Sequence, residues 1–492
     1  MRDVLCLSIA LMLQVPLRAQ CPDGSPPPCP RPAARAPAPN SVAVLYFDNL
    51  SRDTADAFLA DGLTEEIIIR LGQVTRLEVK SRFEVQRFRT RATRLDPPLL
   101  GRSLNATYLV SGSVQRAGNQ VRLRVALVRA ATRAQIWGDI FDRTNDNLLT
   151  VESDIAQAVA QAITGQLLPD ERRRLTRPLT TDPIAYEEYL HGLQLANSWD
   201  EATQRGALIH FDRAIARDSG FAAAFAGKAG VWEVLADGYV SPREGYGQAR
   251  DAASHAIARD SSLATAYARL AEAVLALDLD ARETERLARR AVALDPRNAW
   301  AHSSLGQAFG AAGRIDEWIE EARRAWEVDT LLTVTALLYV DALLYGRRLD
   351  SAAALLVRLR AFLPSADLDP EEGLLRAMRG DWHGAEPLLD WRFYGGWVAG
   401  MYVRALLARG DTLAARATVD SMLAARTPGY YNPIALARAY TALGDIDCGM
   451  EWLRTAFEER TLWVMNWVRV DPELAPLRAD LRYATLERQM RY

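Results

Sequence analysis

The sequence has few of the residues that most often carry catalysis or metal binding. Its 492 residues include five histidines and four cysteines, and Lys80 and Lys228 are the only lysines. No histidine stands in an HExxH or comparable ligand spacing, and no glycine-rich phosphate loop or activated-serine motif follows a predicted strand. We therefore predict no catalytic residue, no metal site and no cofactor. The histidines, interpreted as packing or surface residues, are His191, His210, His255, His302 and His383.

An excess of one charge is also missing. The chain has 59 basic and 62 acidic residues and a net charge of −3, whereas a nucleic-acid-binding protein carries a concentrated basic excess. The one basic stretch, Arg82 to Arg94, fits a solvated strand edge and loop, and a surface for an anionic ligand is the alternative. We predict no nucleic-acid partner.

Long apolar runs are confined to the N-terminus. Arg2 followed by the apolar segment 4–17 is typical of a signal peptide, with cleavage expected after Ala19. This run is too short to span a bilayer, and no later segment approaches about 18 apolar residues. We expect a mature chain without a transmembrane segment, exported to the periplasm or secreted. The residues before Cys21 do not favour a lipoprotein anchor.

Cysteine usage agrees with export. Cys21 and Cys29 flank a turn-forming segment, CPDGSPPPC, and are predicted to form a disulfide. Metal binding is the rival interpretation, but two thiols without two further ligands do not complete a zinc site. Cys448 is expected to be a small core residue of a helix. Residues 1–19 are thus assigned to the signal peptide and 20–40 to a Cys/Pro-rich linker.

Residues 41–170 read as a small α+β domain. The apolar run Val42–Phe47 predicts a buried strand, and a helical period follows over 57–71. Three alternating segments after residue 107 predict an antiparallel meander joined by short turns, and a helix over about 146–168 closes the unit. The predicted order is β-α-β-α-β-β-β-α, followed by a linker over 171–184.

Beyond this linker the pattern changes to helix pairs. Related segments start at Ala214, Ala256, Ala291 and Ala325, with spacings of 42, 35 and 34 residues. A period near 34 is the signature of tetratricopeptide (TPR) helix–turn–helix units. We predict seven or eight units over 185–470, the sixth degenerate, with a long turn near residue 240 and a C-terminal capping segment over 471–492. The fold class is therefore a small α+β domain followed by an all-α TPR solenoid, helical overall.

The stretch LADGLTEEIIIRL, residues 59–71, could hold a carboxylate cluster for acid/base chemistry. On a helix its leucines and Ile67 fall within one arc, and Asp61, Glu65 and Glu66 fall on the opposite side. We interpret the three acids as the solvent face of an amphipathic helix. Gly62 lies mid-helix, where glycine costs about 1 kcal/mol relative to alanine, so a strand or a partner is expected to approach the helix closely there.

The motifs SVAVLYFDNLS, FLADGLTEEIIIRL, LEVKSR, GRSLNATYLVSGSVQRAGNQVRLRVALV and QIWGDIFDR resemble the bacterial TolB-like amino-terminal domain over Ser41 to about Gln166. In that family the domain precedes tetratricopeptide repeats. Relatives often join it to a winged-helix DNA-binding domain, a protein kinase or a nucleotide cyclase. In this chain we expect a signal peptide where those relatives carry such a domain, and the resemblance supplies no catalytic residues.

These patterns predict a non-enzymatic scaffold of the cell envelope that binds a protein or peptide partner in the solenoid groove. An alternative is a sensor of a small molecule or saccharide, because aromatic side chains in the degenerate repeat could stack on sugars. These residues are Trp382, Trp391, Tyr394 and Trp397. A third reading is an enzyme-associated regulatory module related to the cyclase or kinase fusions. Homo-oligomerisation stays open.

Overall fold

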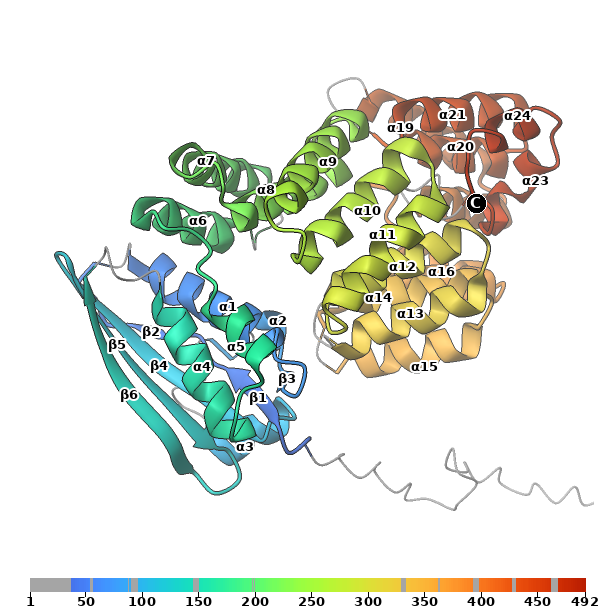
Figure 1. The fold of residues 1–492 in the computed structure, drawn as a ribbon. Coiled ribbons are helices and arrows are strands. Elements are labelled where there is room, and N and C mark those ends of the chain that lie inside the picture. Colours follow the sequence, from blue (N-terminus) through green and yellow to red (C-terminus); the bar gives the residue numbers. More distant parts are fainter. Residues whose placement is uncertain are drawn as a thin grey trace, which may run out of the picture.

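A computed structural model describes residues 37–492, except 54–55, 87, 90–95, 145–149, 197, 199, 329–332, 362, 393–397, 427–430 and 462–467. A sheet with flanking helices is followed by a long series of helix pairs (Figure 1). The predicted fold class, a small α+β region followed by a helical repeat region, is confirmed. Cys21 and Cys29 lie outside the described residues.

The sheet has the strand order β3-β1-β4-β5-β6, and β2 pairs with β4. Strand β1 is parallel to both of its neighbours, and β4, β5 and β6 form the predicted antiparallel meander. In β5, valines and leucines alternate with arginines, so one face is buried and the other meets solvent. The strands are β1 Ser41–Val44, β2 Asp48–Asn49, β3 Glu78–Val79, β4 Tyr108–Ala117, β5 Gln120–Arg129 and β6 Ala134–Thr144.

Helices pack on both faces of the β1 and β4 end of the sheet. Helices α1 (Ala57–Gly72) and α4 (Val151–Thr164) share one apolar cluster with inward residues of the strands. Helices α2 (Arg82–Gln86) and α3 (Pro97–Ser103) contribute to a smaller cluster with alternate residues of β1 and β4. The expected strand edge at the start of 82–94 is therefore wrong, because α2 is helical there.

The helix expected over 146–168 is shorter than predicted. It ends at Gly165, whose φ of +79° reverses the backbone. A separate helix α5 (Pro169–Thr176) follows and begins with proline at its first position. Part of the segment expected as a linker over 171–184 is therefore helical.

Among the described residues, eight consecutive helix pairs follow. In four of them the turn after the first helix contains a glycine with positive φ, namely Gly313, Gly380, Gly410 and Gly444. The pairs are α6 (Pro183–Leu195) and α7 (Glu201–Arg217), α8 (Ala222–Gly238) and α9 (Pro242–Arg259), α10 (Ala264–Asp278) and α11 (Ala281–Leu294), α12 (Ala299–Ala311) and α13 (Ile315–Val328), α14 (Thr333–Tyr345) and α15 (Leu349–Leu359), α16 (Ser365–Met378) and α17 (Trp382–Ala385), α18 (Ala399–Ala408) and α19 (Thr412–Arg426), and α20 (Pro433–Ala442) and α21 (Ile446–Glu459).

Two repeats differ from the regular pattern. The sixth pair is degenerate, because α17 has four residues and continues only into the short 3-10 helix η4 (Glu386–Leu388). The long turn expected near residue 240 is wrong. Helices α8 and α9 have 17 and 18 residues, against 13 and 14 in α12 and α13. The additional residues of the 42-residue spacing therefore extend the helices.

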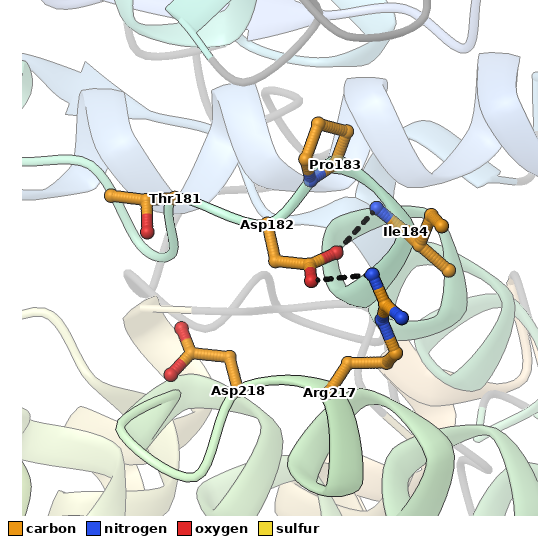
Figure 2. A pocket seen from close by; sticks show the side chains of 6 residues that line it. All are labelled: Thr181, Asp182, Pro183, Ile184, Arg217 and Asp218. Atoms are coloured by element: carbon orange, nitrogen blue, oxygen red, sulfur yellow. Dashed lines mark hydrogen bonds and ion pairs between the residues drawn. The ribbon is translucent and has the colours of Figure 1, made fainter.

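The junction between α5 and the repeats is fixed by Asp182. Its carboxylate accepts from the backbone N–H groups of Ile184 and Ala185 at 2.9 Å and thereby caps α6. Arg217 at the end of α7 donates to the same carboxylate at 2.9 Å (Figure 2). The shallow pocket around these residues is lined by groups that already bond to one another.

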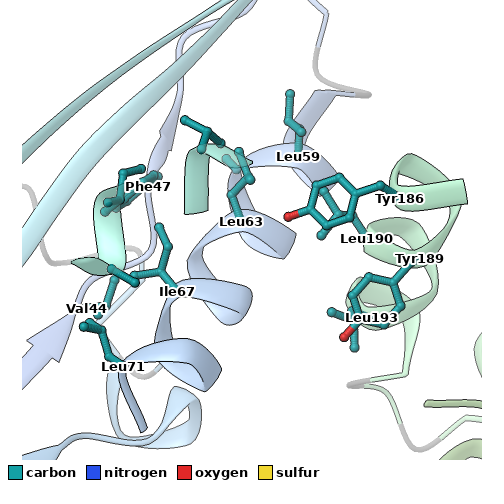
Figure 3. Close-up of a cluster of buried hydrophobic side chains, with 14 of the residues drawn as sticks. Val44, Phe47, Leu59, Leu63, Ile67, Leu71, Tyr186, Tyr189, Leu190 and Leu193 are labelled. Carbon is teal, nitrogen blue, oxygen red and sulfur yellow. The ribbon is translucent and has the colours of Figure 1, made fainter. Parts of the chain in front are cut away.

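The sheet region and the first repeats share one core. A single apolar cluster runs from β1 and α1 to α6, α7 and α8. Leu59 and Leu63 of α1 face the sheet side, and Tyr186 and Leu190 of α6 approach the same helix from the other side (Figure 3). The two regions therefore pack as one continuous interior.

The C-terminal segment lies against the middle of the repeat region. It contains the 3-10 helix η6 (Pro472–Leu474), α23 (Ala475–Arg478) and α24 (Tyr483–Glu487). Leu474, Leu477 and Leu486 join a cluster with Ala273 and Leu275 of α10. The chain end thus returns to a helix some 200 residues earlier in sequence, as the position of C beside α20, α11 and α12 also indicates (Figure 1). Among the described residues, every helix falls short of the length and apolar character needed to cross a bilayer.

Candidate functional site

The three acids of α1 do not face solvent, so the sequence interpretation of this helix was wrong. Asp61, Glu65 and Glu66 are 3%, 1% and 1% exposed. The prediction placed the residues around a helix with one buried face, but α1 lies between the sheet on one side and α6 on the other. Each carboxylate is instead paired with an arginine, since a buried charge without a partner is costly.

Glu66 belongs to a buried network centred on Arg70. Arg70 lies 3.1 Å from the carboxylates of both Glu66 and Glu152, and it donates to the carbonyl oxygen of Leu175 at 2.8 Å. Burial raises the pKa of Glu66 to about 7 and that of Glu152 to about 8, while the charge of Arg70 lowers both. This network connects α1, α4 and the end of α5.

Asp61 and Glu65 bind the start of the basic stretch. Arg89 donates to Asp61 at 2.6 Å, and Arg82 donates to Glu65 at 3.1 Å. Gln194 of α6 also donates to Asp61, at 3.2 Å. Burial raises the pKa of Asp61, and Arg89 opposes that shift. Arg82 and Arg89 thus neutralise buried acids, and residues 90–95 lie outside the described residues.

Gly62 is the point of closest approach between α1 and the repeats. A Cβ built at Gly62 would lie 2.8 Å from Cβ and 2.9 Å from Cδ2 of Leu190 in α6. The expectation of a close neighbour is met, although the neighbour is a repeat helix and not a strand or a partner. Glycine is required here so that the two helices can touch.

The side of the solenoid formed by the first helices is largely occupied by the chain itself. Arg438 of α20 is fully buried and donates to Asp471 at 2.6 Å, directly before η6. A Cβ on Gly400 of α18 would collide with the carboxylate of Glu473. Burial raises the pKa of Glu473 to about 8, and neighbouring Asp471 adds to the shift. The last repeats therefore enclose the C-terminal segment.

Contacts at the end of the chain extend this enclosure to the third and fourth repeats. The backbone N–H of Arg491 donates to the carbonyl of Leu279 at 2.8 Å, and the N–H of Ala281 donates to the carbonyl of Arg491 at 2.7 Å. Arg469 donates to the carbonyl of Ala312 at 3.3 Å. The segment predicted as a C-terminal cap over 471–492 packs against α20 and α21 of the last repeat and also reaches the α10–α11 turn. The chain's own C-terminal segment therefore occupies part of the repeat surface on which the partner groove was predicted.

Side chains on two neighbouring first helices, α10 and α12, remain partly accessible in the middle of the repeat region. Arg269 of α10 forms an ion pair with Glu233 of α8, and its guanidinium stacks over the ring of Trp300 in α12 at 4.7 Å. Tyr267, two residues earlier on α10, lies under Arg290 of α11 at 5.9 Å. Tyr267, Arg269 and Trp300, named here the α10–α12 row, are all partly exposed. Arginine and aromatic side chains are enriched in protein-binding hot spots.

The sheet region also contacts the fourth repeat. Arg297, in the turn before α12, donates to the carbonyl of Leu77 at 3.1 Å and to that of Val79 at 3.2 Å. These carbonyls lie along β3, the edge strand on this side of the sheet. The repeats therefore contact the sheet region through the α11–α12 turn as well as through α6.

The histidines lie in helices, four of them in long repeat helices. His302 is buried and bonds to Glu321 at 2.6 Å, and His210 bonds to Glu188 at 2.6 Å. His191 stacks between Phe58 and His210. His255 lies in α9, and His383 lies in the short helix α17. In the part of the chain that the structure describes, no three acidic, histidine or cysteine side chains are grouped for a metal ion.

The aromatic residues of the degenerate repeat do not form one described site. Trp382 is partly buried against the cluster of α14, α15 and α16, and Trp391 packs against the cluster of α18 and α20. Tyr394 and Trp397 lie outside the described residues. Cys448 is in α21, as expected, but it is half-buried near the start of the helix and not in the core.

No protein-family model matches the chain. A protein of Rhizobium meliloti (strain 1021) named putative adenylate cyclase 3 is 29% identical over 195 residues, which cover 40% of this chain and 33% of that protein. The chain thus spans about a third of this curated relative.

Solved structures of helical repeat proteins show a distant similarity. Yeast Tom70 has a TM-score of 0.36 at 15% identity, covering 61% of this chain and 66% of that chain. Pseudomonas aeruginosa PilF has a TM-score of 0.33 at 17% identity, covering 44% and 96%. YrrB, described as a TPR protein with an unusual peptide-binding site, has a TM-score of 0.27 at 19% identity, covering 41% and 93%.

Proposed function

We propose that this chain is a non-enzymatic protein-interaction scaffold of the bacterial cell envelope. The supporting observation is the series of eight stacked helix pairs, which shares a core with the α+β region. Helix pairs of this kind bury their apolar faces only by stacking, and the stack presents an extended surface suited to a peptide or protein. The acids of α1 act as internal ion pairs in this scaffold.

The α10–α12 row is the part of the repeat surface that we assign to the partner. It joins the first helices α10 and α12, whereas the first helices α18 and α20 of the last two repeats contact the chain's own C-terminal segment. An extended segment lying along the row would stack on Trp300 and Tyr267 and place an acceptor against Arg269.

Capture from an envelope fraction tests this assignment. The immobilised full-length mature protein is compared with Trp300→Ala, Tyr267→Ala and the control Leu413→Ala, whose side chain is 82% exposed on α19. Partners bound by the wild type and the control should be lost from both row variants, provided that each variant retains the wild-type melting temperature. Equal capture by all four proteins would refute the assignment.

Export is part of the proposal and is tested separately. The apolar N-terminal segment supports cleavage after Ala19 and release into the periplasm or medium. Intact-mass measurement of the protein recovered from the periplasmic fraction should show a chain beginning at Gln20. An uncleaved chain recovered from the cytosol would refute the envelope location but not the scaffold role.

Similarity to a protein named putative adenylate cyclase 3 favours a second candidate function, an enzyme-associated regulatory module related to cyclase fusions. The chain spans about a third of that protein, so a shared region does not imply a shared catalytic domain. We expect purified protein to form no cyclic AMP from ATP with Mg²⁺ or Mn²⁺. Turnover that scales with protein concentration and survives repurification would favour the enzyme.

A further inference from the structure

Strand β6 is a long edge whose outer side has no partner strand among the described residues. It has 11 residues and pairs only with β5. The opposite edge is different, because β3 has two residues and Arg297 bonds to carbonyls on it. An exposed edge presents unpaired N–H and C=O groups to which another strand can add.

The side chains of β6 have an ordered charge pattern around Phe141. Asp139 lies two residues before Phe141 and Arg143 two residues after it, and alternation places all three on the same face of the sheet. In the structure Asp139 is exposed, and no cation pairs with it among the described residues. On the other face Ile140 is 57% exposed, while Asp142 is already paired with Arg122 at 2.5 Å.

We propose that β6 pairs with β6 of a second copy of this chain, antiparallel, with the two-fold axis at Phe141. In this register Asp139 of each copy lies opposite Arg143 of the other, so the interface contains the same ion pair twice. Ile140 lies diagonal to Ile140 of the second copy on the opposite face. Residues 138–144 of each copy add to one continuous sheet.

Self-complementarity is the reason for choosing a second copy as the occupant. A two-fold interface brings the same surface together from both subunits, so each acid must find a base at the symmetric position. Asp139 and Arg143 lie at equal distances in sequence from Phe141, so the two-fold axis places each aspartate opposite an arginine. The same charges would deter an arbitrary strand, since edge charges act against unspecific pairing. The inference does not depend on the scaffold role.

Charge reversal tests the register. Sedimentation velocity of the full mature chain over a roughly hundredfold concentration range should show a monomer–dimer equilibrium. Asp139→Arg places like charges opposite each other and should leave a monomer, and Arg143→Asp should do the same. An equimolar mixture of the two variants should form a heterodimer, because every 139–143 pair then joins opposite charges. The exposed Asp350→Arg on α15 is the matched control and should dimerise as the wild type does.

Arg143 also pairs with Asp154 at 3.1 Å, so Arg143→Asp could fail to fold. Hydrogen exchange of the wild type is therefore the second measurement. Backbone amides of 138–144 should exchange more slowly as protein concentration rises, while those of β4 should not change. A wild type that stays monomeric, an Asp139→Arg variant that still dimerises, or exchange in β6 independent of concentration would overturn the proposal.

Discussion

Substituting alanine for Gly62 should destabilise the protein, although alanine is the better helix former. The gain in helix propensity is about 1 kcal/mol. The new Cβ would lie 2.8 Å from Cβ of Leu190, and this neighbour is close to the backbone of α6 and cannot rotate away. Overpacking of a well-filled core costs about 1–3 kcal/mol. We therefore expect a net loss of up to about 2 kcal/mol.

Gly72 provides the control in the same helix. A Cβ at Gly72 would meet nothing within 4 Å, so Gly72→Ala should be neutral or stabilising by up to about 1 kcal/mol. The double variant Gly62→Ala/Leu190→Ala should be more stable than the sum of the two single changes predicts, because the added methyl occupies space that the leucine vacates.

Differential scanning calorimetry of the wild type, Gly62→Ala, Gly72→Ala, Leu190→Ala and the double variant measures these differences. A loss of 1 kcal/mol should lower the melting temperature by about 2–4 °C for a cooperative unit of roughly 150–250 residues. Stabilisation by Gly62→Ala equal to that by Gly72→Ala would show that α1 and α6 do not pack as closely as described. Strict additivity in the double variant would show that Leu190 is not the obstructing neighbour.

Three further predictions concern the buried charges and the edge strand. Burial raises the folded-state pKa of Glu152 to about 8, so its contribution to stability is fully present below the unfolded-state pKa of about 4.3 and is lost as pH rises toward 8. The melting temperature should therefore fall less steeply between pH 5 and 8 for Glu152→Gln than for the wild type. An unchanged slope would contradict this. Arg438→Met should lower the free energy of unfolding by about 3–5 kcal/mol, since it leaves Asp471 buried without a counter-charge. Urea denaturation measures this change. A decrease of less than about 1 kcal/mol would indicate that the C-terminal segment is loosely held. Arg297→Ala should lower the free energy of unfolding by about 1–3 kcal/mol, because it removes the hydrogen bonds to the carbonyls of Leu77 and Val79. Backbone amides around Leu77 should then exchange faster. Unchanged exchange would argue against this contact.

Periodic patterns predicted the elements well. The alternation of β5 and the 34-residue period each reflect local geometry, since a strand repeats every two residues and a helix pair every repeat. Deviations in length were harder to place. The eight additional residues between Ala214 and Ala256 could lengthen either a turn or the helices. Packing against other helices decides between the two, and the sequence of one repeat does not show that packing.

The acids of α1 show why the candidate site was not predictable. Their positions opposite the leucines gave the pattern of an amphipathic helix, which is correct for a helix with one neighbour. Here Arg82 and Arg89 neutralise Glu65 and Asp61 from a different segment. Gly62 was the one local sign of a second neighbour, because its cost in a helix needs a packing reason.

By itself the sequence determined the order of the strands in the chain, the helix-pair repeat and the glycine at the crowded point of α1. These follow from interactions within a few residues or from the period of the apolar pattern. Only the tertiary structure decided that α1 is buried on both sides, that the sheet region and the repeats share a core, and that residues after Val468 pack against α10, α20 and α21. Those outcomes depend on contacts between residues such as Arg438 and Asp471 or Leu279 and Arg491, whose proximity arises from the accumulated rotation of successive repeats and not from any local pattern.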